Sequence, residues 1–127
     1  MSRVLVIDRE EGPAGALASA LEKKGFEVDR VTDPESTYAY LRKQVPQVII
    51  IDLMDEVPDH PADQPEGIKL LAQCYLDHPE IPLLVYTDAP GYREHFWSWA
   101  AAAHVAKSEG PPALLDVMEE MLGEEEV

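Results

Sequence analysis

The sequence predicts an α/β domain of the (βα)5 doubly wound kind, in which a five-stranded parallel sheet lies between two layers of helices. Short apolar segments typical of buried strands alternate five times with segments of helical periodicity. No linker or low-complexity segment interrupts this alternation over the 127 residues. Such alternation is typical of parallel strands joined by right-handed crossovers. The length fits one domain with a sizeable core.

The first unit opens with residues 3–8, where four apolar residues lie between Arg3 and Asp8. Adjacent apolar residues indicate a strand buried on both faces. Pro13 is typical of a helix start, and Gly25 is typical of the position just after a helix. The predicted inner face of this helix consists of Ala14, Leu17, Ala18 and Leu21.

The second unit begins with residues 26–31, whose apolar and polar residues alternate and predict a strand. Asp33 and Pro34 predict the N-cap and the first residue of the following helix. The apolar residues assigned to the inner face of that helix are Tyr38, Leu41 and Val45.

The third unit repeats the opening pattern, since residues 48–51 are Val-Ile-Ile-Ile and Asp52 follows them. A polar loop with three prolines is predicted over residues 54–66. A helix is predicted over residues 67–78, with an inner face of Ile68, Leu71 and Tyr75.

The last two units are shorter. They contain a strand over 81–86, a helix over 92–103, a brief strand at 105–106 and a helix over 111–122. We therefore expect one domain over residues 1–122 and an acidic C-terminal tail over residues 123–127. The room after the brief strand is enough for one helix. If these residues are the whole gene product, we expect its output to be a protein partner; if they are part of a longer chain, an output domain lies elsewhere.

Composition restricts the partners and the compartment. Ten Lys and Arg against 25 Asp and Glu give a net charge of −15, which disfavours nucleic acids and anionic membranes as partners. The single Cys74 excludes an internal disulfide, and we expect it to be a buried, inert thiol. The chain has neither a signal-like start nor an apolar run of about 20 residues, so a cytoplasmic location is predicted. The histidines His60, His78 and His95 lack metal-ligand spacing with any cysteine.

Polar residues follow four of the predicted strands. They are Asp8, Asp52, Thr87 and Lys107. In parallel sheets, ligands bind beyond the carboxyl ends of the strands, so these side chains are candidates for one site. Two carboxylates can hold a divalent cation such as Mg²⁺, and a hydroxyl and an ammonium can bind phosphoryl oxygens. An aspartate can itself accept a phosphoryl group.

These residues resemble the receiver domain of bacterial response regulators, a flavodoxin-like domain of two-component phosphorelay systems. The resemblance covers essentially the whole chain and rests on four motifs in the right order. They are Val-Leu-Val-Ile-Asp8, Ile-Ile-Ile-Asp52-Leu-Met, Leu-Leu-Val-Tyr-Thr87 and Val-Ala-Lys107. The resemblance implies a single-domain signalling protein with no enzymatic activity, loaded by a histidine kinase or phosphotransfer protein.

The resemblance also implies roles for individual residues. Asp52 would be the phosphoacceptor, and Thr87 and Lys107 would bind the phosphoryl group. The implied Mg²⁺ ligands are Asp8, Asp52 and the backbone of Met54. Thr87 and His104 would form the switch, and the signal would leave through the face of helices 92–103 and 111–122. Tyr92, Phe96, Trp97 and Trp99 offer candidate interface anchors there, and a homodimer is one possible use of that face.

The clearest departure from the family pattern is Arg9, which stands where receivers carry a second acid. Counting Asp8 and Asp52 against Arg9 and Lys107 gives the pocket a formal charge near zero. Our preferred hypothesis is that Arg9 pairs with Asp52 or Asp8 and partly replaces the metal. In the alternative, Arg9 points to solvent and Glu10 or Glu11 helps to hold the metal.

Two further departures concern loops. The 54–66 loop is longer than usual, and it is either a solvated insertion or a segment that covers the pocket, binds metal or contacts a partner. Ser108 follows Lys107 where the family usually has a proline, so a trans peptide bond is expected.

Two functions other than phosphoacceptance by Asp52 have to be weighed, and only the first of them stays open. The chain is either a working phosphoacceptor or a pseudo-receiver, a protein-interaction module that is never phosphorylated. A Mg²⁺-dependent phosphohydrolase is disfavoured, because its general acid would stand two residues after Asp52, where the chain has Met54.

Overall fold

The computed structural model describes residues 2–53, 66–88 and 99–126, and it has the predicted α/β architecture. Five parallel strands form one sheet in the order β2-β1-β3-β4-β5. The strands are β1 (Arg3–Ile7), β2 (Glu27–Val31), β3 (Val48–Ile51), β4 (Leu83–Tyr86) and β5 (Ala103–Val105). The helices are α1 (Glu11–Lys23), α2 (Pro34–Lys43), α3 (Glu66–Asp77) and α4 (Pro111–Glu126).

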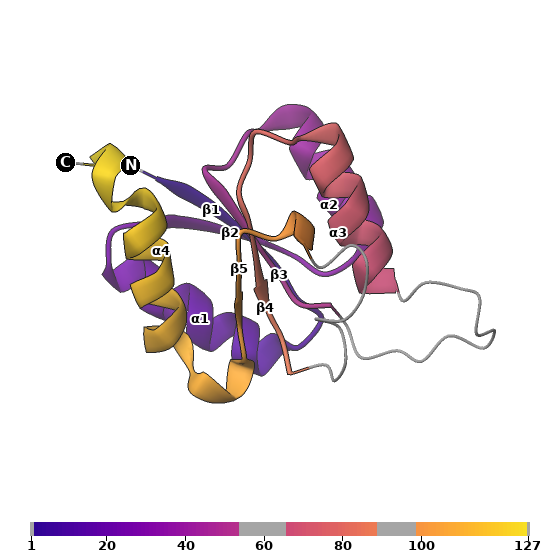
Figure 1. Cartoon of the computed structure of the whole chain (residues 1–127). Coiled ribbons are helices and arrows are strands. Elements are labelled where there is room, and N and C mark those ends of the chain that lie inside the picture. The colour runs from indigo at the N-terminus through magenta and orange to yellow at the C-terminus, as the bar shows by residue number, and fades with distance from the viewer. Residues whose placement is uncertain (1, 54–65, 89–98, 127) are drawn as a thin grey trace.

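The helices cover the two faces of the sheet in pairs, with α1 and α4 on one face and α2 and α3 on the other (Figure 1). Alternate residues of the central strands point to opposite faces, which divides the core into two layers. Val4, Val6, Val48 and Ile50 pack toward α1 and α4, whereas Leu5, Ile7, Ile49 and Ile51 pack toward α2 and α3. The central strands are buried on both faces, as their continuous apolar runs predict.

Local signals correctly predicted the first helix and the start of the second. Ala14, Leu17, Ala18 and Leu21 are all buried on α1, and Gly25 follows this helix with φ of +98°. Asp33 caps α2 by accepting a hydrogen bond of 2.7 Å from the backbone N–H of Ser36. Cys74 is buried on α3, and burial raises the pKa of its thiol to about 12, as expected for an inert cysteine.

Several strand and helix ends are shifted by one or two residues from the sequence predictions, and three differences have consequences for the fold. Val45 lies outside α2 and is 69% exposed, because the residue before Pro46 is sterically kept from the helical region. Ala103 belongs to β5 rather than to the end of a helix, since it pairs with Leu84 in the sheet. The last helix continues to Glu126 instead of ending at Leu122.

Several predictions fall on residues outside the described ranges. They are most of the 54–66 loop, the Met54 backbone ligand, His60, His95, and the part of the 92–103 helix that carries Tyr92, Phe96 and Trp97. Within the described residues, Trp99 is 54% exposed, and its ring meets that of Tyr75 on α3 edge to face with centroids 4.9 Å apart. None of the helices found in the described part of the chain is long and apolar enough to cross a membrane.

Candidate functional site

Asp8 and Asp52 lie side by side at the carboxyl ends of β1 and β3. These are the two neighbouring strands whose crossover connections run toward opposite edges of the sheet. β1 and β3 are neighbours, with Ile7 opposite Ile51, and the next residue of each strand carries the carboxylate. The backbone N–H of Asp52 donates to the carbonyl of Ile7 at 2.9 Å, which extends the pairing to the carboxyl end. Because crossovers leave β1 and β3 in opposite directions, this is the crevice in which doubly wound folds bind ligands.

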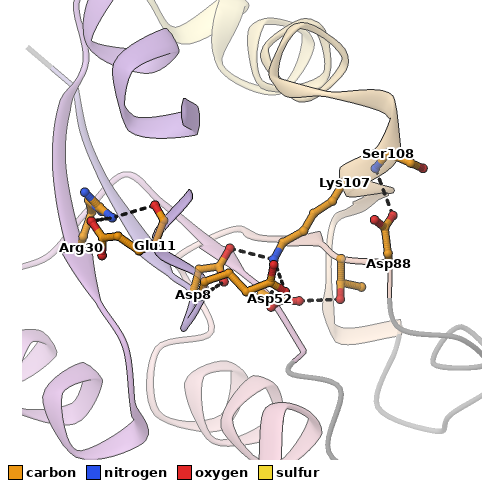
Figure 2. Close-up of polar contacts among 9 residues, drawn as sticks. Asp8, Glu11, Arg30, Asp52, Asp88, Lys107 and Ser108 are labelled. Carbon is orange, nitrogen blue, oxygen red and sulfur yellow. Dashed lines mark hydrogen bonds and ion pairs between the residues drawn. The ribbon is translucent and has the colours of Figure 1, made fainter. Parts of the chain in front are cut away.

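Lys107 supplies the positive charge of the site. It begins a short 3₁₀ turn after β5, and its Nζ lies 2.9 Å from Oδ2 of Asp8 and 3.1 Å from Oδ2 of Asp52. Oε1 of Glu10 is 3.4 Å from the same nitrogen. Figure 2 shows Lys107 reaching from its turn to the two aspartates. The ammonium is therefore held by three carboxylates.

Thr87 approaches Asp52 from the other side. It follows β4, and its backbone N–H donates to the carbonyl of Val105 at 3.1 Å, which fixes it beside β5. Its buried hydroxyl donates a hydrogen bond of 2.5 Å to Oδ1 of Asp52. The two oxygens of Asp52 thus have different partners, Thr87 on one and Lys107 on the other.

The turn that carries Lys107 is held in place by Asp88, whose Oδ1 accepts a hydrogen bond of 3.0 Å from the backbone N–H of Ser108 (Figure 2). The turn ends at Gly110, where φ of +84° favours glycine. The described residues contain no cis peptide bond, in agreement with the trans bond expected before Ser108.

Burial and charge act in opposite directions on the ionisable groups of the site. Burial raises the pKa of Asp8, although the N–H of Glu10 and the ammonium of Lys107 both stabilise its carboxylate. Burial by itself would lower the pKa of Lys107, but the hydrogen bonds and charges of Asp8 and Asp52 outweigh it and raise that pKa. Lys107 is therefore a permanent cation at neutral pH.

The site opens into a cavity of about 380 Å³. Its lining residues are Glu10, Pro13, Ala16, Asp52, Tyr86, Thr87, Asp88, Lys107 and Pro111. Asp52 is buried but belongs to this lining, so a reactant in the cavity can reach its carboxylate.

The carboxylates of the site fit a hard divalent cation. One oxygen each from Asp8, Glu10 and Asp52 lies within 4.8 Å of the others. Mg²⁺ prefers oxygen ligands of this kind. The ammonium of Lys107 already occupies a position among all three, so their geometry suits a positive charge. The third ligand that the resemblance implies, the Met54 backbone, lies outside the described residues.

The position of Arg9 corrects our preferred hypothesis. Its guanidinium forms an ion pair with Glu66, the first residue of α3, at 2.5 Å. The cation that pairs with Asp8 and Asp52 is Lys107 instead. The charge count changes too, because three carboxylates and one ammonium give a formal charge of −2 rather than zero. Of the two acids in the alternative hypothesis, Glu10 joins the cluster, whereas Glu11 pairs with Arg30.

Sequence reasoning missed the partner of Arg9. Glu66 lies 57 residues further along the chain, and no local pattern connects the two.

His104 lies on β5 opposite Val85 and is partly buried, three residues before Lys107. Its predicted switch role stays a prediction.

Comparisons with known proteins agree with the geometry. No protein-family model matches the chain. A probable transcriptional regulatory protein, TcrX of Mycobacterium tuberculosis (strain ATCC 25618 / H37Rv), is 31% identical over 84 residues. The match includes 66% of this chain and 33% of that protein, so the shared region spans about a third of the relative.

Several solved structures of response regulators and receiver domains have the same fold. The response regulator TrrA of Thermotoga maritima, solved with Mg²⁺ and BeF, has a TM-score of 0.81 and 24% identity, covering 96% of this chain and 100% of that one. A CheY-like receiver domain of Methanospirillum hungatei JF-1 has a TM-score of 0.82 and 23% identity, covering 99% and 97%. TrrA in complex with the histidine kinase ThkA matches with a TM-score of 0.79 and 23% identity, covering 96% and 99%. The receiver-type, flavodoxin-like fold predicted from the motifs is therefore confirmed.

Proposed function

We propose that this chain is a receiver domain of two-component signal transduction that accepts a phosphoryl group on Asp52. The observation that carries the proposal is the arrangement around that carboxylate. Thr87 donates to one of its oxygens, Lys107 binds the other, and the cavity beside it is open. A hydroxyl and an ammonium at this distance can bind the oxygens of a phosphoryl group once it is attached. The fold shared with TrrA supports the same function.

The donor in this proposal is a phosphohistidine of a kinase or phosphotransfer protein, as the complex of ThkA with TrrA suggests. An oxygen of Asp52 attacks phosphorus, the new O–P bond forms as the P–N bond breaks, and the imidazole leaves and takes up a proton. The product is an acyl phosphate on Asp52. Mg²⁺, held by Asp8, Glu10, Asp52 and the Met54 backbone, would neutralise phosphoryl charge when bound.

In this proposal, phosphorylation changes the contacts of Asp52, and this change transmits the signal to the surface of the domain. Thr87 moves from the carboxylate to the phosphoryl group, and His104 on the neighbouring β5 adjusts with it. The proposed output is a downstream protein, or a second copy of the chain, that binds the face of residues 92–103 and 111–122. The net charge of −15 argues against nucleic acid as a direct partner of this domain.

In this proposal the chain is a signalling module and not an enzyme, and residues 1–122 form its working unit beside the acidic stretch 123–127. A phosphohydrolase needs a general acid near the nucleophile, and Met54 at the expected position cannot serve. The proposed location is the cytoplasm, which suits a chain with one buried, unpaired cysteine.

Incubation with acetyl phosphate and Mg²⁺, followed by intact-mass measurement, tests the proposal. We expect one phosphoryl adduct on the wild type and on Asp116→Asn, which changes an exposed acid on α4, and none on Asp52→Asn. An unlabelled wild type, under conditions that label an ordinary receiver, would overturn phosphoacceptance and leave a pseudo-receiver. An adduct that survives in Asp52→Asn would place the acceptor elsewhere.

A further inference from the structure

The turn that carries Lys107 is short, and its backbone hydrogen bonds are local. The N–H of Glu109 donates to the carbonyl of Ala106 at 3.0 Å, and that of Gly110 donates to Lys107 itself at 3.0 Å. These bonds fix the shape of the turn. Ser108 is the second residue of the turn, where a backbone N–H has no acceptor within the helix. The place of the turn beside the sheet therefore also depends on contacts from outside it.

Asp88 supplies such a contact from the neighbouring strand. It directly follows Thr87, whose N–H donates to the carbonyl of Val105 on β5 at 3.1 Å. The backbone that leads to Asp88 is thus tied to the sheet. Its Oδ1 accepts the hydrogen bond of 3.0 Å from the N–H of Ser108 (Figure 2). This carboxylate therefore connects the end of β4 to the residue next to Lys107.

We propose that Asp88 is a positioning residue for Lys107 in phosphoryl transfer, because it holds the turn from which the ammonium reaches Asp52. This inference rests on the proposed function, in which Lys107 binds oxygens of the phosphoryl group. Nζ of Lys107 lies 3.1 Å from Oδ2 of Asp52, a distance at which a small displacement already weakens the hydrogen bond. Without the side chain of Asp88, water takes its place at the N–H of Ser108, and the turn can shift together with its lysine.

The charge of Asp88 has to be separated from its hydrogen bond. Asp88 is one of the residues that line the cavity beside Asp52, so its carboxylate also repels an anionic phosphoryl donor. Asp88→Asn removes the charge and keeps an oxygen that can accept from the N–H of Ser108. Asp88→Ala removes both. The difference between these two variants therefore measures the hydrogen bond alone, and because Asp88 is exposed, both should fold.

The first measurement is the rate constant for labelling by acetyl phosphate in saturating Mg²⁺, followed by intact mass. One hydrogen bond changes an equilibrium by about twofold to tenfold, and we expect Asp88→Ala to be labelled more slowly than Asp88→Asn by about this factor. The second measurement does not need phosphorylation. It is the NMR signal of the two ε-methylene protons of Lys107, which is assigned by its absence in Lys107→Met. These protons have separate chemical shifts while the side chain is held in one position. We expect separate shifts in the wild type and Asp88→Asn and one averaged shift in Asp88→Ala.

Three results would overturn the proposal. One is an Asp88→Ala variant that is labelled as fast as Asp88→Asn or that keeps the separate shifts of Lys107. Another is an Asp88→Asn variant with the averaged shift of Asp88→Ala, because the charge of Asp88 would then act and not its hydrogen bond. The third is an averaged shift in the wild type. Far-ultraviolet circular dichroism confirms that each variant is folded. A wild type that is not labelled, although the shifts of Lys107 respond as expected, would overturn only the proposed function.

Discussion

The hydroxyl of Thr87 donates a hydrogen bond of 2.5 Å to Oδ1 of Asp52, so the proposed phosphoacceptor is bound by the proposed switch residue before any phosphoryl group is present. Lys107 binds the other oxygen at 3.1 Å. Phosphoryl transfer therefore has to exchange existing contacts of Asp52 for new ones. The same groups that would stabilise the phosphorylated state also contribute to the stability of the unmodified fold.

Thr87→Ala tests the first of these contacts. The substitution removes the donor from a buried carboxylate oxygen, and we expect the free energy of unfolding to fall by about 1–3 kcal/mol. Thr87→Ser is the matched control, because it keeps the hydroxyl and loses only a methyl group. Urea unfolding measures both, and equal stability of the two variants would refute a contribution from the hydrogen bond.

Lys107→Met tests the second contact. Loss of the ammonium leaves Asp8, Glu10 and Asp52 facing one another without a cation. We expect a loss of about 2–3 kcal/mol, somewhat below the cost for a fully buried pair because the site opens into a cavity. Millimolar Mg²⁺ should restore more stability to this variant than to the wild type, since it replaces the lost charge. Thermal unfolding with and without Mg²⁺ checks this, and an identical Mg²⁺ effect on both proteins would contradict it.

Asp8→Asn should stabilise the protein at neutral pH. Burial raises the pKa of Asp8 above its ordinary value of 3.8, so the folded state binds a proton more readily than the unfolded chain. The free energy of unfolding therefore falls as the pH rises from the ordinary to the folded pKa. Asparagine removes this ionisation, and the advantage of the variant should vanish below about pH 4.

Asp29→Asn provides the opposite control for that pH dependence. A hydrogen bond from Tyr40 and the nearby Arg3 lower the pKa of Asp29. Its carboxylate thus contributes stability that is present above the ordinary pKa and is lost as the pH falls through the folded pKa. Asp29→Asn should destabilise the protein at neutral pH, and the difference from the wild type should disappear in acid. Melting temperatures of both variants across the acidic range measure this, and shifts of the same sign at neutral pH would contradict the assignment.

Gly67→Ala tests the contact between α3 and the end of β3. A Cβ at this position would lie 2.0 Å from the carbonyl oxygen and 2.4 Å from the Cα of Leu53, so the backbone must move. We expect a loss of about 1–3 kcal/mol, the usual cost of overpacking. Gly15→Ala is the comparison, because its Cβ would meet nothing within 4 Å and should stabilise α1 by about 0.5–1 kcal/mol. Urea unfolding of the two variants should give shifts of opposite sign.

The sequence by itself determined the order of the strands, the four helices that the structure describes and the edge of the sheet at which the site lies. The run of residues 48–51 predicts a buried strand, and the Asp33-Pro34 pair predicts a helix start, because both signals depend only on neighbouring residues. The error at Val45 has a local cause as well, since Pro46 follows it. Parallel strands then bring their terminal polar residues to one edge, which is why Asp8, Asp52, Thr87 and Lys107 meet.

Only the tertiary structure decided how charges pair within that edge. Lys107 contacts Glu10, which is 97 residues away in the chain, and Arg9 contacts Glu66 at a separation of 57. The sequence predicts that Asp8 and Asp52 lie at the same edge of the sheet as Arg9, and therefore it allowed Arg9 to pair with either carboxylate. In the structure, Lys107 pairs with both of them. The close packing of Gly67 on Leu53 brings Glu66 within reach of Arg9. A pairing of that kind depends on where whole helices pack, and the pattern of neighbouring residues does not record it.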